Sequence, residues 1–260
     1  MTMHAWALTN AGLLLLVAQI MLLWMFTQYA LPELYGARRG VKPLSRAALA
    51  QLAVRGVLAG VASYWLAEWH ASIAILMLVA CVVVGWLRSK VRPAYGAEFE
   101  VAVNGFFIAA VVWLAWWTGA SPHAAGRIPN SKSAAVLIIA AIGLFTVRGG
   151  TYVVRGLLDK VGTLPPLNKE ARTDAEFTLD IKEYNRGRLI GDIERILLVV
   201  MVAVHSYEAL GFLIAAKGLI RSRELENRSW AEYFLVGTLA STLVAVVAGL
   251  AIHFTIRVLW

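Results

Sequence analysis

The chain has 260 residues, of which 60% are hydrophobic and only 15% are charged. A soluble domain is closer to half apolar and a quarter charged, so this composition predicts a protein whose apolar surface faces lipid and excludes a large soluble domain. The net charge of +8 comes from basic residues that flank apolar runs and do not form one patch with aromatic side chains. This pattern excludes nucleic acid as a partner and makes the lipid bilayer, with its anionic headgroups, the expected one.

Seven apolar segments are long enough, or nearly long enough, to cross a bilayer as helices. A spanning helix needs roughly 20 mostly apolar residues for a hydrocarbon core about 30 Å thick. The segments cover approximately residues 11–31, 50–68, 71–88, 100–118, 133–155, 190–216 and 230–257. The predicted fold is therefore an all-α, polytopic transmembrane helix bundle with about seven spanning helices, in which the second and third helices form a tight hairpin.

Basic residues between these segments predict the orientation of the chain. They cluster after the first, third and fifth segments, at Arg38, Arg39, Lys42, Arg46, Arg88, Lys90, Arg92, Lys160, Lys169, Arg172, Lys182, Arg186 and Arg188. The positive-inside rule makes that face cytoplasmic, with the N-terminus outside and the C-terminus inside. One loop disagrees, because Lys217, Arg221, Arg223 and Arg228 fall on the outer face. Either nearby acidic residues and snorkelling make this tolerable, or the segment at 133–155 enters and leaves without crossing.

Three regions follow from this pattern. Residues 1–156 hold the first five membrane helices, and residues 190–260 hold the last two. Between them, residues 157–189 form a polar loop on the cytoplasmic face, in which two adjacent prolines stop any helix. We predict an amphipathic surface helix from Asp174 onward.

Two arginines lie within the fifth segment, where an ionisable side chain is costly and is a functional hypothesis by default. Arg148 and Arg155 are seven residues apart and share a face of the predicted helix. Gly149 and Gly150 lie between them and permit the close approach of another backbone. The pair suits an anionic headgroup or substrate, and it equally fits snorkelling to the interface or pairing with acids of a neighbouring helix.

The ionisable pair that most strongly suggests a functional site is His205 and Glu208, near the middle of the sixth segment. Their i, i+3 spacing places both side chains on one face of a helix. Such a pair can relay protons, can hold a metal when a facing helix supplies more ligands, or can lock two helices together by a buried hydrogen bond. No second ligand cluster is visible, and the single cysteine, Cys81, is isolated. We therefore predict neither a metal site nor a cofactor.

Charges also crowd the start of the sixth segment. This cytoplasmic charge cluster consists of Arg188, Asp192, Glu194 and Arg195. Solvated interfacial charge explains such a cluster, because surface ion pairs contribute little each. The alternative is that the cluster fixes the loop geometry or meets the charges of a partner.

The seventh segment has a stripe of mostly small side chains at every fourth position. The stripe consists of Gly237, Ser241, Ala245, Gly249 and His253. Small residues at this spacing let a second helix approach closely. We predict a packing surface here, either internal or directed towards a partner.

The C-terminal third has the most distinctive sequence, YNRGRLIGDIERILL followed by ALGFLIAAKGLIRSRELENRSWAEYFLVGTLAST. It resembles a bacterial integral-membrane family known as domain of unknown function 3307. The resemblance covers residues 184–242 and rests on Arg188, Gly191, Glu194, Arg195, Gly211, Lys217, Glu224, Arg228, Glu232, Tyr233, Gly237 and Thr238. It implies a multi-pass protein of the bacterial inner membrane, without implying an activity.

Members of that family carry His/Asp pairs four residues apart, one in the first helix and one near the end of a later helix. Such pairs look like a metal or acid–base constellation. The corresponding positions here are Gln19 with Leu23 and Cys81 with Gly85. The resemblance thus implies that the polar site of the family is missing from this chain.

Three functions remain open at this stage. The first is a non-catalytic component that packs against other membrane proteins, as a complex subunit or a homo-oligomer. The second is a transporter or carrier of a small polar or lipidic solute, with His205, Glu208 and Arg148 lining the path. The third is a membrane-embedded enzyme acting on lipid. We predict the first, because the seventh segment has its stripe of small side chains, polar groups are scarce within the spans, and the His/Asp pairs of the similar family are missing.

Overall fold

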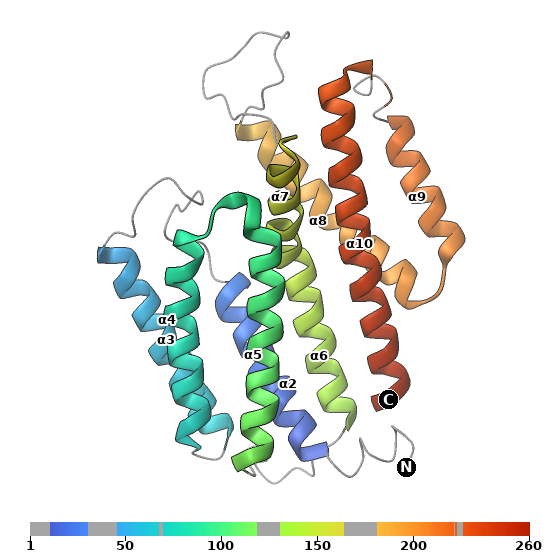
Figure 1. The fold of residues 1–260 in the computed structure, drawn as a ribbon. Helices are drawn as coiled ribbons and strands as arrows, with labels where there is room; N and C mark the ends of the chain where they lie inside the picture. Colours follow the sequence, from blue (N-terminus) through green and yellow to red (C-terminus); the bar gives the residue numbers. More distant parts are fainter. Residues whose placement is uncertain are drawn as a thin grey trace. The chain divides into compact units, whose positions relative to one another are not determined.

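The computed structural model describes residues 11–30, 46–67, 70–118, 131–163, 181–220, 222 and 226–260. Over these residues the chain is helical and contains no strand (Figure 1). It divides into two compact units. The first unit comprises Met1–Arg92, Phe99–Phe145 and Phe254–Trp260, and the second comprises Pro93–Glu98 and Thr146–His253.

The first unit is built from the N-terminal helices. Its elements are α2 (Ala11–Met25), which continues into the π turn η1 (Phe26–Ala30), α3 (Arg46–Leu66), α4 (Ala71–Lys90), most of α5 (Gly96–Thr118) and α6 (Ser131–Leu144). Helix α2 packs against α6 and α3. The indole ring of Trp24 on α2 stacks on the ring of Phe107 on α5, with 3.9 Å between the ring centroids. Apolar side chains therefore hold α2 among its neighbours.

Helices α3 and α4 form the hairpin that the sequence predicts for the second and third segments. A Cβ atom placed on Gly56 would lie 3.2 Å from the carbonyl oxygen of Leu78, and one on Gly60 would lie 3.3 Å from that of Ala74. These pairings run in opposite directions along the two helices, which are therefore antiparallel. The two glycines allow the backbones to approach closely.

The second unit contains the rest of the chain. Its elements are η2 (Pro93–Tyr95), most of the π turn η3 (Phe145–Gly149), α7 (Gly150–Val161), α8 (Ile181–Ala203), α9 (Tyr207–Ile220) and most of α10 (Arg228–Leu259). Helices α7 and α10 run antiparallel, because Gly150 lies beside Val244 and Leu158 lies beside Gly237. Gly162 ends α7 with a positive φ of 77°, a conformation that favours glycine after a helix.

Helices α8 and α9 form a second hairpin within this unit. Helix α8 ends at Ala203, and α9 begins at Tyr207. The Lys217 ammonium on α9 lies 2.5 Å from the Glu194 carboxylate on α8, and these residues are nearly equidistant from the break. The two helices are therefore antiparallel, and α9 returns towards the end at which α8 begins (Figure 1).

Five helical segments in the described residues are long and apolar enough to cross a membrane. They are Ala11–Ala30, Ala71–Lys90, Gly96–Thr118, Ser131–Val161 and Arg228–Leu259. Each matches one of the seven predicted spans. The predicted second span is the helix α3, which Arg46, Gln51 and Arg55 make less apolar than these five.

The predicted sixth span at 190–216 is wrong as a single helix, because the break at residues 204–206 divides it into α8 and α9. The fifth segment, by contrast, is helical from Ser131 to Val161, so it does not turn back within that range. The predicted region boundary at residue 156 therefore falls inside α7. The predicted start of the amphipathic helix, Asp174, lies outside the described residues.

We predict that Gly249→Ala destabilises the fold. A Cβ atom at Gly249 on α10 would lie 2.6 Å from the Cβ of Val202 and 2.9 Å from the carbonyl oxygen of Val199, both on α8. The helices must then move apart, at a cost of about 1–3 kcal/mol in the free energy of unfolding. Thermal unfolding in a mild detergent measures this loss.

Gly211→Ala is the matched control, because nothing lies within 4 Å of a Cβ atom at that position of α9. Alanine there removes the entropic cost of a helical glycine, and stability should rise by about 0.5–1 kcal/mol. Equal effects of the two substitutions would contradict the close approach of α8 and α10.

Candidate functional site

The first unit contains a buried polar network that joins α2, η1 and α5. The indole N–H of Trp24 donates to the side-chain oxygen of Asn104 (2.8 Å). The amide nitrogen of Asn104 donates to the hydroxyl oxygen of Tyr29 (2.6 Å). The Tyr29 hydroxyl in turn donates to a carboxylate oxygen of Glu100 (2.8 Å), whose side chain is fully buried. Each donor therefore meets an acceptor inside the unit.

Arg88, near the end of α4, neutralises this carboxylate. Its Nε and Nη2 atoms donate to the two oxygens of Glu100, each at 3.0 Å, and its Nη1 atom donates to the side-chain oxygen of Gln28 at 3.1 Å. A bidentate arginine–carboxylate pair is among the strongest side-chain contacts and fixes the geometry of both groups. The network therefore ties three helices together, and its charges are fully engaged with one another.

The second unit contains another internal charge network. Arg195 on α8 is only 4% exposed, and its Nη2 atom contacts Asp192 at 2.5 Å and the Thr151 hydroxyl at 2.7 Å. Thr151 also donates to Asp192 at 3.1 Å. Gly150 makes room for this guanidinium, because a Cβ atom there would lie 3.3 Å from its Nη1 atom. The neighbours of Gly150 are therefore the side chains of Arg195 and Val244, and not the second backbone that the sequence suggested.

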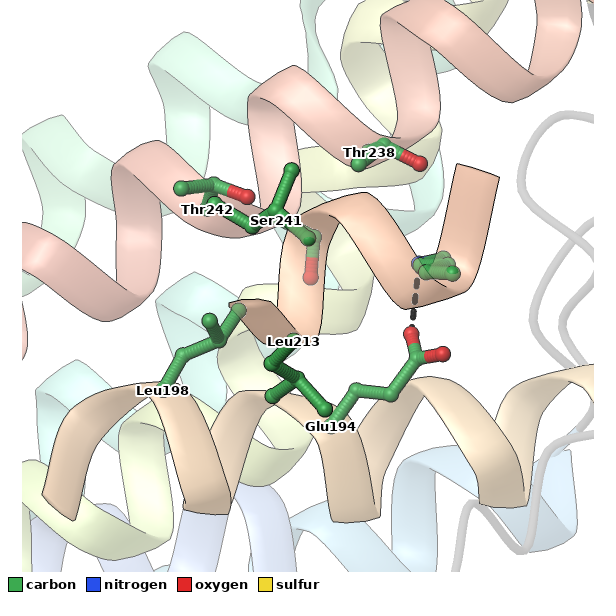
Figure 2. Close-up of a pocket in the computed structure, with 8 residues that line it drawn as sticks. Glu194, Leu198, Leu213, Thr238, Ser241 and Thr242 are labelled. Atoms are coloured by element: carbon green, nitrogen blue, oxygen red, sulfur yellow. Dashed lines mark hydrogen bonds and ion pairs between the residues drawn. The ribbon is translucent and has the colours of Figure 1, made fainter. Parts of the chain in front are cut away.

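A pocket lies between α8, α9 and α10, at the ion pair of Glu194 and Lys217. Its lining consists of Glu194, Leu198, Leu213, Ile214, Lys217, Thr238, Ser241 and Thr242. Figure 2 shows the side chains of α8 and α10 facing one another across it, with the ion pair at one end. The lining of the pocket therefore combines charges, hydroxyl groups and an apolar wall.

These contacts change the interpretation of the cytoplasmic charge cluster. Asp192 and Arg195 pair with each other, and Glu194 pairs with Lys217. Solvated charge does not describe Asp192, Glu194 and Arg195, because their side chains are only 14%, 20% and 4% exposed. The side chain of Arg188, the fourth predicted member, lies outside the described residues.

His205 and Glu208 do not share a helix face, contrary to the prediction. His205 lies in the break with a φ of 60°, and Glu208 lies in the first turn of α9. The ring of His205 instead lies edge-on to that of His253, with 4.1 Å between the ring centroids. The i, i+3 argument fails because it requires one continuous helix through both residues.

The remaining predicted residues are placed as follows. Arg148 lies in η3 and is exposed, whereas Arg155 lies in α7 and is half-buried. The stripe on α10 packs inside the second unit: Gly249 meets α8, Ala245 is fully buried, and His253 lies 3.3 Å from the carbonyl oxygen of Ala203. Of the two alternatives for the stripe, the structure supports the internal one.

No group of three or more potential metal ligands occurs in the described part of the chain. Sequence reasoning missed the network around Glu100, although a usable signal existed. Glu100 and Asn104 are four residues apart in a predicted span, where polar side chains need hydrogen-bond partners from the protein. The partners themselves lie 71 and 75 residues away along the chain at Tyr29, and no local pattern indicates them.

No family model matches the chain, and comparisons with curated proteins and with solved structures give no match. The resemblance of residues 184–242 to the 3307 family stays a prediction. Four of the residues on which it rests, Glu194, Arg195, Lys217 and Thr238, belong to the internal charge network or to the pocket.

We predict that Arg88→Gln and Glu100→Gln each lower the free energy of unfolding by about 3–5 kcal/mol, because each leaves the opposite charge without its main partner in a buried site. The double variant should lose less than the sum of the two. Thermal unfolding in a mild detergent measures all three.

Arg228→Gln is the control, because its ion pair with Glu232 is exposed, with side-chain exposures of 93% and 51%. It should unfold like the unmodified chain. Additive losses at Arg88 and Glu100 would show that the two charges are not coupled.

Proposed function

We propose that the chain is a multi-pass protein of a bacterial inner membrane with a non-catalytic role. It binds another membrane protein, either a different subunit or a second copy, through the tip of the α8–α9 hairpin. Five apolar helices support its place in the membrane. The charged groups of both networks support the non-catalytic role, because they are engaged with one another and with neighbouring polar groups.

The exposed tip of the hairpin is the observation that carries this proposal. Residues 204–206 interrupt the helix, and Val204 is 66% exposed. His205 and Glu208 are also exposed. The tip lies 11 residues beyond Glu194, about 16 Å along α8 and therefore deep in a core about 30 Å thick. At that depth non-helical backbone and a carboxylate are tolerated only against protein or water.

Helix α9 supports the same proposal. With 14 residues it is about 21 Å long, which is too short to cross a core of about 30 Å. None of its residues is buried. Phe212 and Ile220 are 75% and 84% exposed. A partner that covers the tip therefore also finds an apolar helix surface beside it.

A returning hairpin would also agree with the positive-inside rule for the charged loops. If α2, α3, α4, α5, α6–α7 and α10 each cross once and α8–α9 returns to the face from which it enters, all four basic loops lie on one side. These loops are residues 31–45, 91–95, 162–180 and 221–227. The positive-inside rule makes that side cytoplasmic. Both termini then lie outside, whereas seven crossings put the C-terminus inside.

Reporter fusions test this orientation. Alkaline phosphatase fused after Trp260 should be active, because it folds only outside the cytoplasm, and green fluorescent protein at the same position should stay dark. The opposite pattern should hold for fusions at Asn227. Fluorescence from the Trp260 fusion would support seven crossings and contradict the returning hairpin.

Photo-crosslinking in intact membranes tests the partner. A photoreactive residue at Val204 should give a protein adduct, because the tip is covered by protein. The matched control is Phe106, which is 77% exposed on α5 and should crosslink to lipid alone. An adduct of twice the chain mass identifies a second copy, and a different mass identifies another subunit. Lipid adducts alone at Val204 would contradict the proposal.

A carrier of a small polar or lipidic solute is the second candidate, favoured by the same break. Interrupted helices line the solute sites of many transporters, where water satisfies the exposed backbone. In that case a cysteine at Val204 reacts with a membrane-impermeant maleimide and no protein adduct forms. The third alternative, a lipid-acting enzyme, depended on His205 and Glu208 sharing a face, which they do not.

A further inference from the structure

Two opposite charges in the second unit are left unpaired by the described part of the chain. Arg148 lies in the π turn η3 and Glu208 lies in the first turn of α9, and both side chains are exposed. Neither takes part in an ion pair or a side-chain hydrogen bond with a described residue. An ionisable side chain within a membrane is costly unless it is paired. Both charges therefore need a partner from elsewhere.

Arg148 lies too far along its helix to reach the membrane surface. The helix continues from Ser131 to Val161, with Lys132 and Lys160 near its two ends. Arg148 is 12 residues from Lys160 and 16 from Lys132, about 18 and 24 Å along the helix. With a core of about 30 Å centred between the two lysines, Arg148 lies about 12 Å inside the nearer edge. That is farther than an arginine side chain extends, so a lipid phosphate at the surface does not neutralise it.

An acid that the structure brings to the start of α7 is already engaged. The Asp192 carboxylate accepts from Arg195 at 2.5 Å and from the Thr151 hydroxyl at 3.1 Å. The carbonyl oxygen of Val147, in the π turn, faces the same guanidinium at 3.4 Å. Arg195 and Asp192 thus form a neutral pair beside the turn. Arg148 adds a positive charge that this pair does not compensate.

Contacts within the second unit place Arg148 and Glu208 at similar depths. Thr151 on α7 and Lys217 on α9 both contact the same turn of α8. The start of α7 is its end nearer the hairpin tip, because α7 runs antiparallel to α10, whose His253 contacts the end of α8. Arg148 lies three residues from Thr151 towards the tip, about 5 Å, and Glu208 lies nine residues from Lys217, about 14 Å. The difference of about 9 Å is one that two long side chains can bridge between neighbouring helices.

We propose that two copies of the chain associate in the membrane and that Arg148 of each copy forms an ion pair with Glu208 of the other copy. The inference rests on the proposed contact through the hairpin tip, which carries Glu208, and it names a second copy as the partner. A two-fold axis along the membrane normal brings equivalent residues to the same depth and forms the pair twice, so the contact closes on itself. Both charges are then neutralised in a region without water, where ion pairing is strong.

Charge reversal in separately purified chains tests the pair. Full chains with donor and acceptor dyes are reconstituted in phosphatidylcholine vesicles, and energy transfer measures their association as the protein density is varied. Arg148→Glu and Glu208→Arg each place like charges opposite one another, so each variant alone should associate about a hundredfold or more weakly than the unmodified chain. An equimolar mixture of the two variants should regain the association, because each copy supplies the charge that the other lacks. Mixing does not restore a pair that forms within one chain.

A mixture that stays monomeric would overturn the pair, and so would a single reversal that leaves association unchanged. Arg148→Gln and Glu208→Gln keep the test decisive if a reversed charge prevents folding, because each removes one charge and should weaken association about tenfold or more. Glu232→Arg is the control. Its exposed ion pair with Arg228 lies in the first turns of α10, outside the proposed contact, and this variant should associate like the unmodified chain.

The adduct at the hairpin tip separates this inference from the proposed function. A photoreactive residue at Val204 that gives an adduct of twice the chain mass supports both. An adduct of another mass would keep the tip as a site for a partner and overturn the second copy as that partner. Lipid adducts alone would contradict both.

Discussion

The hydrocarbon interior of a membrane offers no hydrogen-bond partner, and this constraint explains how polar side chains are arranged in both units. The buried carboxylate of Glu100 has such partners, because Arg88 and Tyr29 donate to its two oxygens. In the second unit, Asp192 and Thr151 satisfy the Nη2 atom of Arg195, whereas its buried Nε atom has no hydrogen-bond partner among the described residues. A polar group without a partner in its own chain therefore indicates a place where water or another molecule must supply the hydrogen bond.

Both polar networks lie at π turns. The first turn, η1, carries Gln28 and Tyr29, and the second, η3, carries the carbonyl of Val147 that faces Arg195 at 3.4 Å. A π turn widens the helix locally and often accompanies a functional position. Here each turn brings backbone or side-chain oxygens to an arginine from a different helix. In both units, a π turn therefore contributes to the packing of helices.

The sequence predicts the helices well where a long apolar run is decisive. Five runs became helices able to cross a membrane, and the tight hairpin predicted for the second and third runs is formed by α3 and α4. The break at His205 escaped prediction, because no proline or glycine marks it and the apolar runs on both sides have the length expected of one spanning helix. The networks also escaped, because Tyr29 and Glu100 meet only through the tertiary fold.

The account depends on these helices having lipid as their solvent. Washing membranes with alkaline carbonate strips proteins that are held only at the surface, and it leaves proteins whose helices cross the bilayer. We predict that the chain stays in the washed membrane and leaves it only when detergent is added. Recovery of folded, monodisperse chain in buffer without detergent or lipid would contradict the account.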